Sequence, residues 1–95
     1  MEKKEFEAAI GKAFTVKAGE NEIALKLVSV DPLKKVEGID NAREEPFSLV
    51  FTGPEDSHLS DDSYEMAIEG HGEKIIFISA HKKDDKHIFY DSVFN

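Results

Sequence analysis

Apolar and polar residues alternate in short segments along most of this chain. In Pro46–Thr52 every second side chain is large and apolar, and Gly53-Pro54 ends the pattern. The segment Ser63–Glu69 alternates equally well. The last segment, His87–Phe94, sets one face against another, and its two faces are Ile88, Tyr90, Ser92 and Phe94, and Phe89, Asp91 and Val93. A period of two is typical of a β-strand that buries one face. The pattern therefore predicts strands over these three ranges.

The segment Ile23–Val30 changes phase along its length. Its first apolar side chains share one face, whereas Val28 and Val30 fall on the other. A phase shift inside one strand indicates a bulge or a crossing between two layers. A shorter strand over Phe14–Lys17 precedes it, and Gly19-Glu20-Asn21 supplies the turn between them.

The strand predicted over Glu73–Ser79 has a different pattern. Ile75, Ile76, Phe77 and Ile78 form a continuous apolar run after the turn Gly70-His71-Gly72. Such a run indicates a strand that is covered on both faces. The polar segment that follows, from His81 to His87, reads as the tip of a hairpin.

Two further segments lie outside the strand pattern. Residues 3–10 predict a short helix, because Phe6, Ala9 and Ile10 have the spacing of one helical face and Gly11 can close the helix in a left-handed conformation. Residues 31–45 predict a loop that is long by the usual standards. Long loops carry function more often than short ones.

Together these elements predict the fold class. Five or six short strands, with turns every ~8–12 residues, are typical of a small antiparallel barrel or sandwich, here with a short N-terminal helix. A meander is the simplest order for the last three strands. The length of 95 residues fits a single domain over residues 1–95. The pattern leaves both a barrel and a sandwich open.

Most of the aromatic residues are expected in the core. We expect most of them to be needed there in a chain of this length: Phe47, Phe51, Tyr64, Phe77, Phe89 and Phe94. Tyr90 carries a hydroxyl that must find a partner or water if the ring is buried. The last strand is apolar in part on both sides, so we expect it to lie inside the sheet and to close it.

Charge is distributed unevenly along the sequence. The net charge is −8, and the stretch from Asp40 to Glu73 holds ten acidic residues against one basic residue, Arg43. Nucleic acid and anionic membrane surfaces are therefore not expected as partners, because both need clustered Lys and Arg. The chain has no cysteine, which excludes disulfides and thiolate chemistry, and no apolar run long enough for a membrane helix or a secretory signal. The expected location is the cytoplasm.

Candidate chemistry is weak in each case. His81 and His87 flank the predicted hairpin tip with Asp84 and Asp85 between them, but a solvated polar turn explains them better than a metal site. The acidic stretch 55–63 lacks the spacing of a calcium-binding loop. There is no Gly-x-Ser-x-Gly elbow and no glycine-rich phosphate loop. The sequence predicts neither an enzyme nor a cofactor.

The chain resembles an uncharacterised family of small bacterial β domains. The resemblance rests on the stretch Pro46–Pro54, on Ile76-Phe77-Ile78 and on the ending Phe94-Asn95. Asp62-Ser63 and Ser79-Ala80 depart from the family pattern at two turns. The family has no established activity, and the resemblance implies a scaffold or interaction module, encoded in some members near phage-tail-like genes.

These observations give three functional hypotheses. The first is a non-enzymatic protein-interaction or structural domain, accessory to a phage-tail-like assembly. The second is an acidic inhibitor or immunity-type protein that binds a basic partner. The third is a small-ligand-binding domain, or a minor enzyme, that uses the 31–45 loop. A protein partner is expected, the oligomeric state is open, and the candidate partner-binding acidic face consists of Glu55, Asp56, Asp61, Asp62, Glu65 and Glu69.

Overall fold

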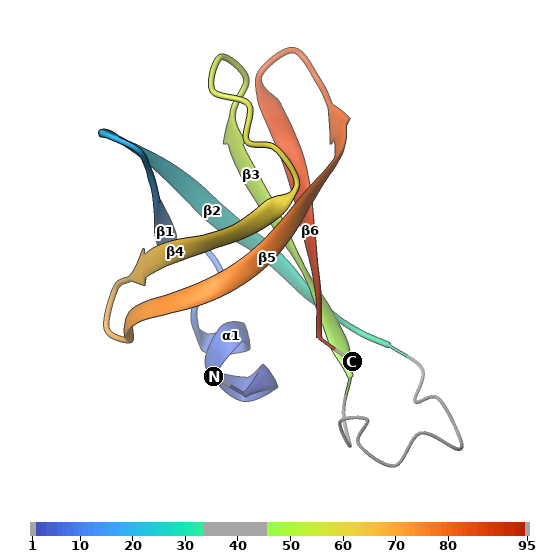
Figure 1. Cartoon of the computed structure of the whole chain (residues 1–95). Coiled ribbons are helices and arrows are strands. Elements are labelled where there is room, and N and C mark those ends of the chain that lie inside the picture. The colour runs from blue at the N-terminus through green and yellow to red at the C-terminus, as the bar shows by residue number, and fades with distance from the viewer. Residues whose placement is uncertain (1, 34–45, 95) are drawn as a thin grey trace.

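The computed structural model describes residues 2–33 and 46–94 and contains one helix and six strands (Figure 1). All pairs of neighbouring strands are antiparallel, and they close into a barrel with the order β1-β2-β3-β6-β5-β4. The barrel alternative is therefore correct, and the last three strands form the predicted meander. The elements are α1 (Lys3–Ala8), β1 (Ala13–Ala18), β2 (Asn21–Pro32), β3 (Phe47–Pro54), β4 (Asp62–Ile68), β5 (Gly72–Lys83) and β6 (His87–Phe94).

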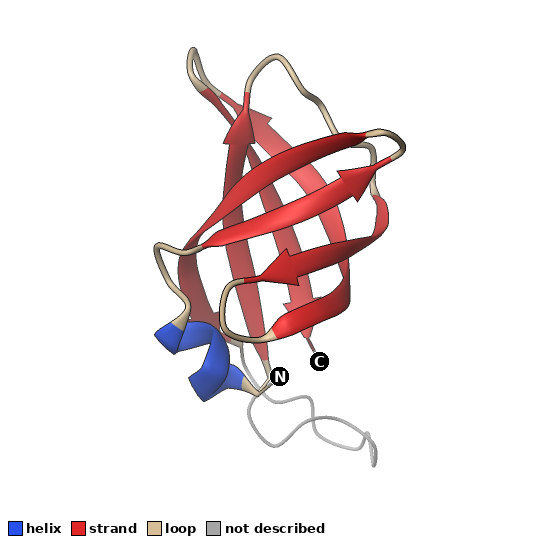
Figure 2. Cartoon of the chain, turned by 90° about the vertical axis from the view of Figure 1, so that its left-hand side faces the viewer, coloured by secondary structure: helices blue, strands red, loops and turns tan. Residues whose placement is uncertain are grey.

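Two strands, β2 and β5, are much longer than the others and bend around the barrel (Figure 2). The first half of each pairs with one neighbour and the second half with another. The register of β2 against β3 shifts between Leu27 and Ser29, which places a bulge at Val28. This confirms the bulge that the phase shift predicts, because a bulge reverses which side chains point inward. A second shift, between Ala80 and Lys82, bends β5.

The core fills the barrel and is rich in aromatic rings. Phe14 and Phe51 pack edge to face with their ring centroids 5.0 Å apart. Phe47 stacks on Phe94 at 4.9 Å, and both rings contact Phe6 from the helix. Ring pairs of this kind stabilise a fold beyond the area that they bury. A side chain at position 53 would clash with the core, since a Cβ on Gly53 would lie 2.7 Å from Leu25 Cδ2.

Helix α1 covers one end of the barrel. It is shorter than the predicted range and ends at Ala8. Phe6 and Ala9 are buried as expected, whereas Ile10 is 45% exposed, because the helix ends before Ile10 can join their face. Gly11 has the expected left-handed φ of +89°, beyond the end of the helix. In the described part of the chain no helix is long and apolar enough to cross a membrane.

The last strand lies between β3 and β5, as its pattern predicts. Ile88, Tyr90 and Ser92 face the core and are nearly inaccessible to solvent. The predicted polar tip is shorter than expected, because β5 extends to Lys83 and only the residues from Asp84 to Lys86 connect it to β6. Of the predicted 31–45 loop, Asp31 and Pro32 belong to β2 and residues 34–45 lie outside the described residues.

Candidate functional site

Strand β5 has two apolar faces, of which the barrel buries only one. Ile76 and Ile78 point into the core and are 3% and 0% exposed. Ile75 and Phe77 point outward and are 77% and 54% exposed. The prediction that this run is covered on both faces is therefore wrong, and so is the expected burial of Phe77. The reason is architectural: a closed barrel covers each strand from the inside only, and no second layer packs on β5 among the described elements.

Val93 on β6 extends this exposed apolar surface. It is 56% exposed and lies on the outer face of its strand. Val93 lies two residues beyond Asp91 on β6, and Phe77 lies two residues before Ser79 on β5, so both follow the Ser79–Asp91 pair toward the same end of the barrel. We call Ile75, Phe77 and Val93 the β5–β6 patch. Exposed groups of large apolar side chains on small proteins often mark binding surfaces.

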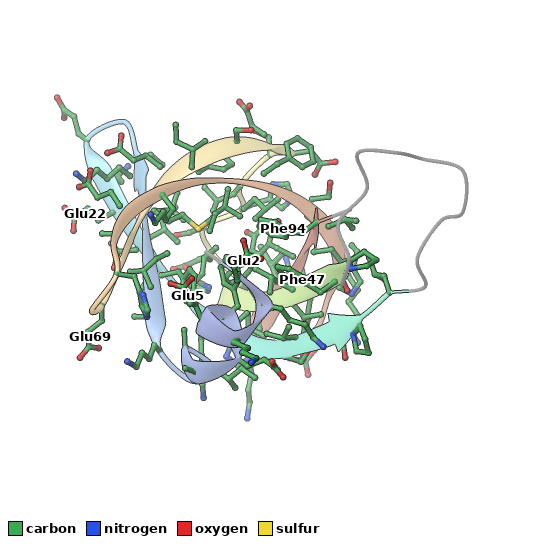
Figure 3. All side chains as sticks on the ribbon, turned by 90° about the horizontal axis from the view of Figure 1, so that it is seen from below. Glu2, Glu5, Glu22, Phe47, Glu69 and Phe94 are labelled. Carbon is green, nitrogen blue, oxygen red and sulfur yellow. The ribbon has the colours of Figure 1, made fainter. Side chains whose placement is uncertain are left out.

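The β5–β6 ladder is short. It begins at Ser79–Asp91 and ends at Lys83–Ile88. From Gly72 to Ile78, β5 pairs with β4 alone in the described part of the chain. Figures 1 and 3 show the two strands parting toward the end of the barrel where α1 lies. Among residues 2–33 and 46–94, the edge of β5 that faces away from β4 therefore has no paired strand beside the β5–β6 patch.

Carboxylates border the patch. Glu65 on β4 is the cross-strand neighbour of Ile75, and Glu73 lies on the same face of β5. The hydrogen bond between these two carboxyls raises the pKa of Glu65 and lowers that of Glu73. Lys17 Nζ also bonds Glu73 Oε1 at 2.8 Å, which lowers the pKa of Glu73 further and raises that of Lys17.

At the other end of the patch, Asp91 Oδ1 lies 3.0 Å from His81 Nδ1. The His81 ring also packs near the Phe89 ring. Lys82 Nζ lies over the Phe89 ring, 4.6 Å from its centroid. Phe89 therefore lies on the outer surface under polar side chains and is not part of the core that the sequence predicts. His81 is held by these contacts, whereas His87 lines a hollow on the other side of its strand. No cluster of three metal-ligating side chains occurs among the described residues.

The predicted acidic residues occupy four places along the chain. Glu55 and Asp56 lie in the turn after β3, Asp61 and Asp62 lie at the start of β4, Glu65 lies within it and Glu69 lies in the turn after it. Asp61 Oδ1 accepts a hydrogen bond from the Ala80 backbone N–H at 3.0 Å, so it also ties the β3–β4 connection to β5. Glu69 lies at the far end of β4 from Asp61 (Figure 3). Of the predicted set, only Glu65 borders the β5–β6 patch directly. That these six residues bind a partner stays a prediction.

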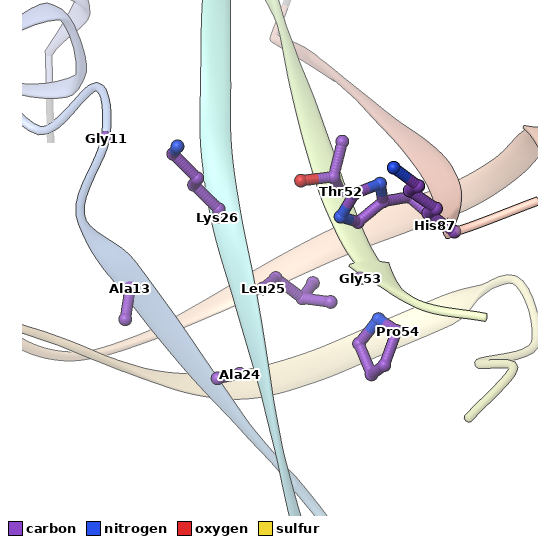
Figure 4. Close-up of a pocket in the computed structure, with 10 residues that line it drawn as sticks. Gly11, Ala13, Ala24, Leu25, Lys26, Thr52, Gly53, Pro54 and His87 are labelled. Atoms are coloured by element: carbon purple, nitrogen blue, oxygen red, sulfur yellow. The ribbon is translucent and has the colours of Figure 1, made fainter. Parts of the chain in front are cut away.

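A hollow of about 460 Å³ lies on the outer face of β1, β2 and β3 (Figure 4). Its floor is formed in part by the small residues Gly11, Ala13 and Ala24. Lys26 stands in it, and Lys86 and His87 reach it from the β5–β6 hairpin. Its lining among the described residues carries nitrogen-bearing side chains and no carboxylate, which suits an anion.

Residues 1–94 match the family described as "Domain of unknown function (DUF6916)", and the chain belongs to that family. No curated protein and no solved structure matches this chain. The family thus covers nearly the whole chain, as the resemblance in the sequence indicates, and the candidate site stands on its own geometry.

The β5–β6 patch is the part of the candidate site that sequence reasoning missed. The signal was present in the run from Ile75 to Ile78, because a one-layer barrel wall needs only alternate apolar residues. The additional pair, Ile75 and Phe77, exceeds what the core requires. Val93 carried no comparable signal, since single apolar residues on a surface are common.

Proposed function

We propose that this chain is a non-enzymatic protein-interaction domain and that the β5–β6 patch is its contact surface. The observation that carries the proposal is the exposure of Ile75 and Phe77 on one strand, at 77% and 54%. Burying each such side chain against a partner contributes about 1.5–3 kcal/mol of hydrophobic free energy. Ile75 and Phe77 lie on one strand, and Val93 lies on β6 beyond the end of the β5–β6 ladder. Together these three side chains can form the apolar centre of an interface.

The surroundings of the patch support a partner of basic character. Glu65, Glu73 and Asp91 border the apolar side chains, and the whole chain carries a net charge of −8. An apolar centre with a charged rim is the usual anatomy of a protein interface. The complementary charge speeds association and selects the partner. An assembly of the phage-tail type would supply such a partner as one of its other components.

The experiment is site-specific photo-crosslinking in cells that naturally make the protein. The photoreactive residue p-benzoylphenylalanine replaces Phe77 in one variant and Val28 in the control. Val28 is the matched control because it is 43% exposed and lies on β2, away from the patch. The expected result is one adduct from position 77 that added wild-type protein competes away and that an Ile75→Asp/Phe77→Asp protein does not. Adducts of equal yield from positions 77 and 28, or none that wild-type protein competes for, would refute the proposal.

The acidic inhibitor is a second candidate with an observation of its own. Glu55, Asp56 and Asp61 lie in the connection between β3 and β4, at the end of the barrel opposite α1, and Asp62 begins β4. A basic active site would be attracted to this group over a range that salt shortens. A Glu55→Gln/Asp56→Asn protein would then bind its target more slowly, whereas an Ile75→Ser/Phe77→Ser protein would bind it normally. The opposite result supports the β5–β6 patch.

A small anionic ligand in the hollow is the third candidate. Lys26, Lys86 and His87 are the observation that favours it. A ligand that binds only the folded state raises the unfolding temperature. Citrate and phosphate should therefore stabilise the wild-type protein and fail to stabilise Lys26→Ala. Equal shifts in both proteins would show a general salt effect instead.

A further inference from the structure

We infer that the open edge of β5 accepts an extended, Lys- or Arg-bearing segment of the partner protein as an added β-strand. This inference rests on the proposed protein-interaction function and specifies how the partner binds. Its structural basis is the place where the barrel wall is incomplete. From Gly72 to Ile78, β5 has β4 on one side and no paired strand on the other among the described residues.

The unpaired edge is long enough to hold a strand. It covers the seven β5 positions that pair with β4, from Gly72 to Ile78. At about 3.3 Å per residue this is a length of ~23 Å, which is typical of a β-strand. The backbone N–H and C=O groups on an open edge are a template for another chain. An added strand would satisfy them with main-chain hydrogen bonds.

The exposed side chains lie where an added strand would use them. Ile75 and Phe77 stand two residues apart on the outer face of β5. A strand placed on the open edge would set alternate side chains beside them, since side chains of neighbouring strands on one face lie about 5 Å apart. Val93 would flank the same strand from β6. Alternate residues of β5 along the open edge thus present apolar side chains to an added strand.

Charge decides between a second copy of this chain and a different partner. Glu73 lies on β5 itself, Glu69 lies in the turn where β5 begins, and Asp91 stands where the β5–β6 ladder opens. Glu5 of α1 approaches the same end of β5, with its Oε2 3.9 Å from His71 Nδ1. A second copy would bring another net charge of −8 against these groups. Glu73 shares the outer face of β5 with Ile75 and Phe77. A segment that carries two apolar residues and a Lys or Arg at every second position, all on one face, therefore complements both the carboxylate and the patch.

The probe is the heptapeptide acetyl-Thr-Val-Thr-Val-Thr-Lys-Thr-amide, titrated into the full ¹⁵N-labelled chain at low salt. Paired antiparallel to β5, it sets its two Val side chains beside Phe77 and Ile75 and its Lys beside Glu73, all on one face. A first control peptide has Glu in place of Lys. A second has the original side chains but N-methyl groups on alternate backbone amides, which removes main-chain donors and leaves the charge unchanged. We expect amide shifts concentrated in Gly72–Ile78 and at Val93. We also expect each control to bind at least about tenfold more weakly, because one loses charge complementarity and the other loses strand pairing.

Three outcomes would overturn the inference. Equal binding by the N-methylated peptide would show contact through side chains alone, which leaves the protein-interaction proposal intact. No amide shift at millimolar peptide would show that the edge does not accept a strand, and the crosslinking from position 77 would still test the interaction. Concentration-dependent broadening of Gly72–Ile78 without peptide would assign the edge to a second copy. An Ile75→Ser/Phe77→Ser chain should bind the lysine peptide more weakly than a Val28→Ser chain.

Discussion

The hydroxyl of Tyr90 accepts a hydrogen bond from the backbone N–H of Leu59 at 3.1 Å, inside the barrel. Tyr90 is fully buried and Leu59 is 4% exposed. The bond ties the connection between β3 and β4 to the last strand, 31 residues further along the chain. It also gives the buried phenol the partner that the sequence requires.

This bond makes the first prediction. We expect Tyr90→Phe to lower the free energy of unfolding by about 1–3 kcal/mol, because it leaves a buried N–H without an acceptor. Tyr64→Phe is the control, since its hydroxyl donates to the Ser60 carbonyl at 2.8 Å in an exposed position. We expect the control to change stability by less than ~0.5 kcal/mol. Urea unfolding measures both, and equal losses would contradict the assignment.

The alkaline stability of the protein gives the second prediction. Burial raises the pKa of Tyr90 above its ordinary value of about 10. The folded state thus favours the neutral phenol, so this contribution to stability is complete below the ordinary pKa. It is lost as the pH rises toward the raised pKa of the folded state. Wild-type protein should therefore lose more stability than Tyr90→Phe above pH ~10. Parallel curves for the two proteins would show that Tyr90 titrates normally.

Deletion of Ser92–Asn95 gives the third prediction. Ser92, Val93 and Phe94 pair with β3, and the Phe94 ring packs on Phe47 and Phe6. The deletion would uncover these two rings and shorten the strand that closes the barrel. We expect the truncated chain to be unfolded at 25 °C by circular dichroism, because the deletion removes the half-buried Phe94 ring, the buried Ser92 and three positions of the β3–β6 ladder together. An unchanged unfolding temperature would refute the role of this strand end.

The fourth prediction separates the two faces of β5. We expect Ile75→Ser/Phe77→Ser to change the free energy of unfolding by no more than ~0.5 kcal/mol, since exposed side chains contribute little. Ile76→Ser, on the adjacent position, should cost at least about 2 kcal/mol because Ile76 is 3% exposed. Thermal or urea unfolding compares the proteins. If the double variant is as unstable as Ile76→Ser, the patch belongs to the fold and not to an interface.

Much of the fold follows from the residue pattern. The range of β6 agrees with the prediction residue for residue, and the phase shift in β2 locates the bulge at Val28. These features are local: alternation and its interruptions are properties of a few neighbouring residues. The choice of a barrel over a sandwich is not local. It depends on β1 pairing with β4 across 50 to 54 residues, through the three residue pairs Phe14–Ile68, Thr15–Ala67 and Val16–Met66.

The candidate site was less accessible to sequence reasoning. The run from Ile75 to Ile78 predicts a doubly covered strand, whereas the outer half of the run is exposed. A pattern shows that a face is apolar but not whether this chain covers it. The open edge of β5 is a further case, since it arises from where the β5–β6 ladder stops at Ser79 and Asp91. The acidic residues, by contrast, can be counted from the sequence, but their division between two ends of β4 cannot.

Amide hydrogen exchange of the full chain tests most directly whether β5 keeps one edge open for a partner. Alternate N–H groups of a strand point to opposite sides, so in the free chain we expect every second amide between Gly72 and Ile78 to exchange rapidly. The remaining amides there, which face β4, should exchange slowly. With the protein captured from position 77 bound, the rapid set should slow by at least about tenfold. Uniform protection of Gly72–Ile78 in the free chain, or an unchanged rapid set in the complex, would contradict the account.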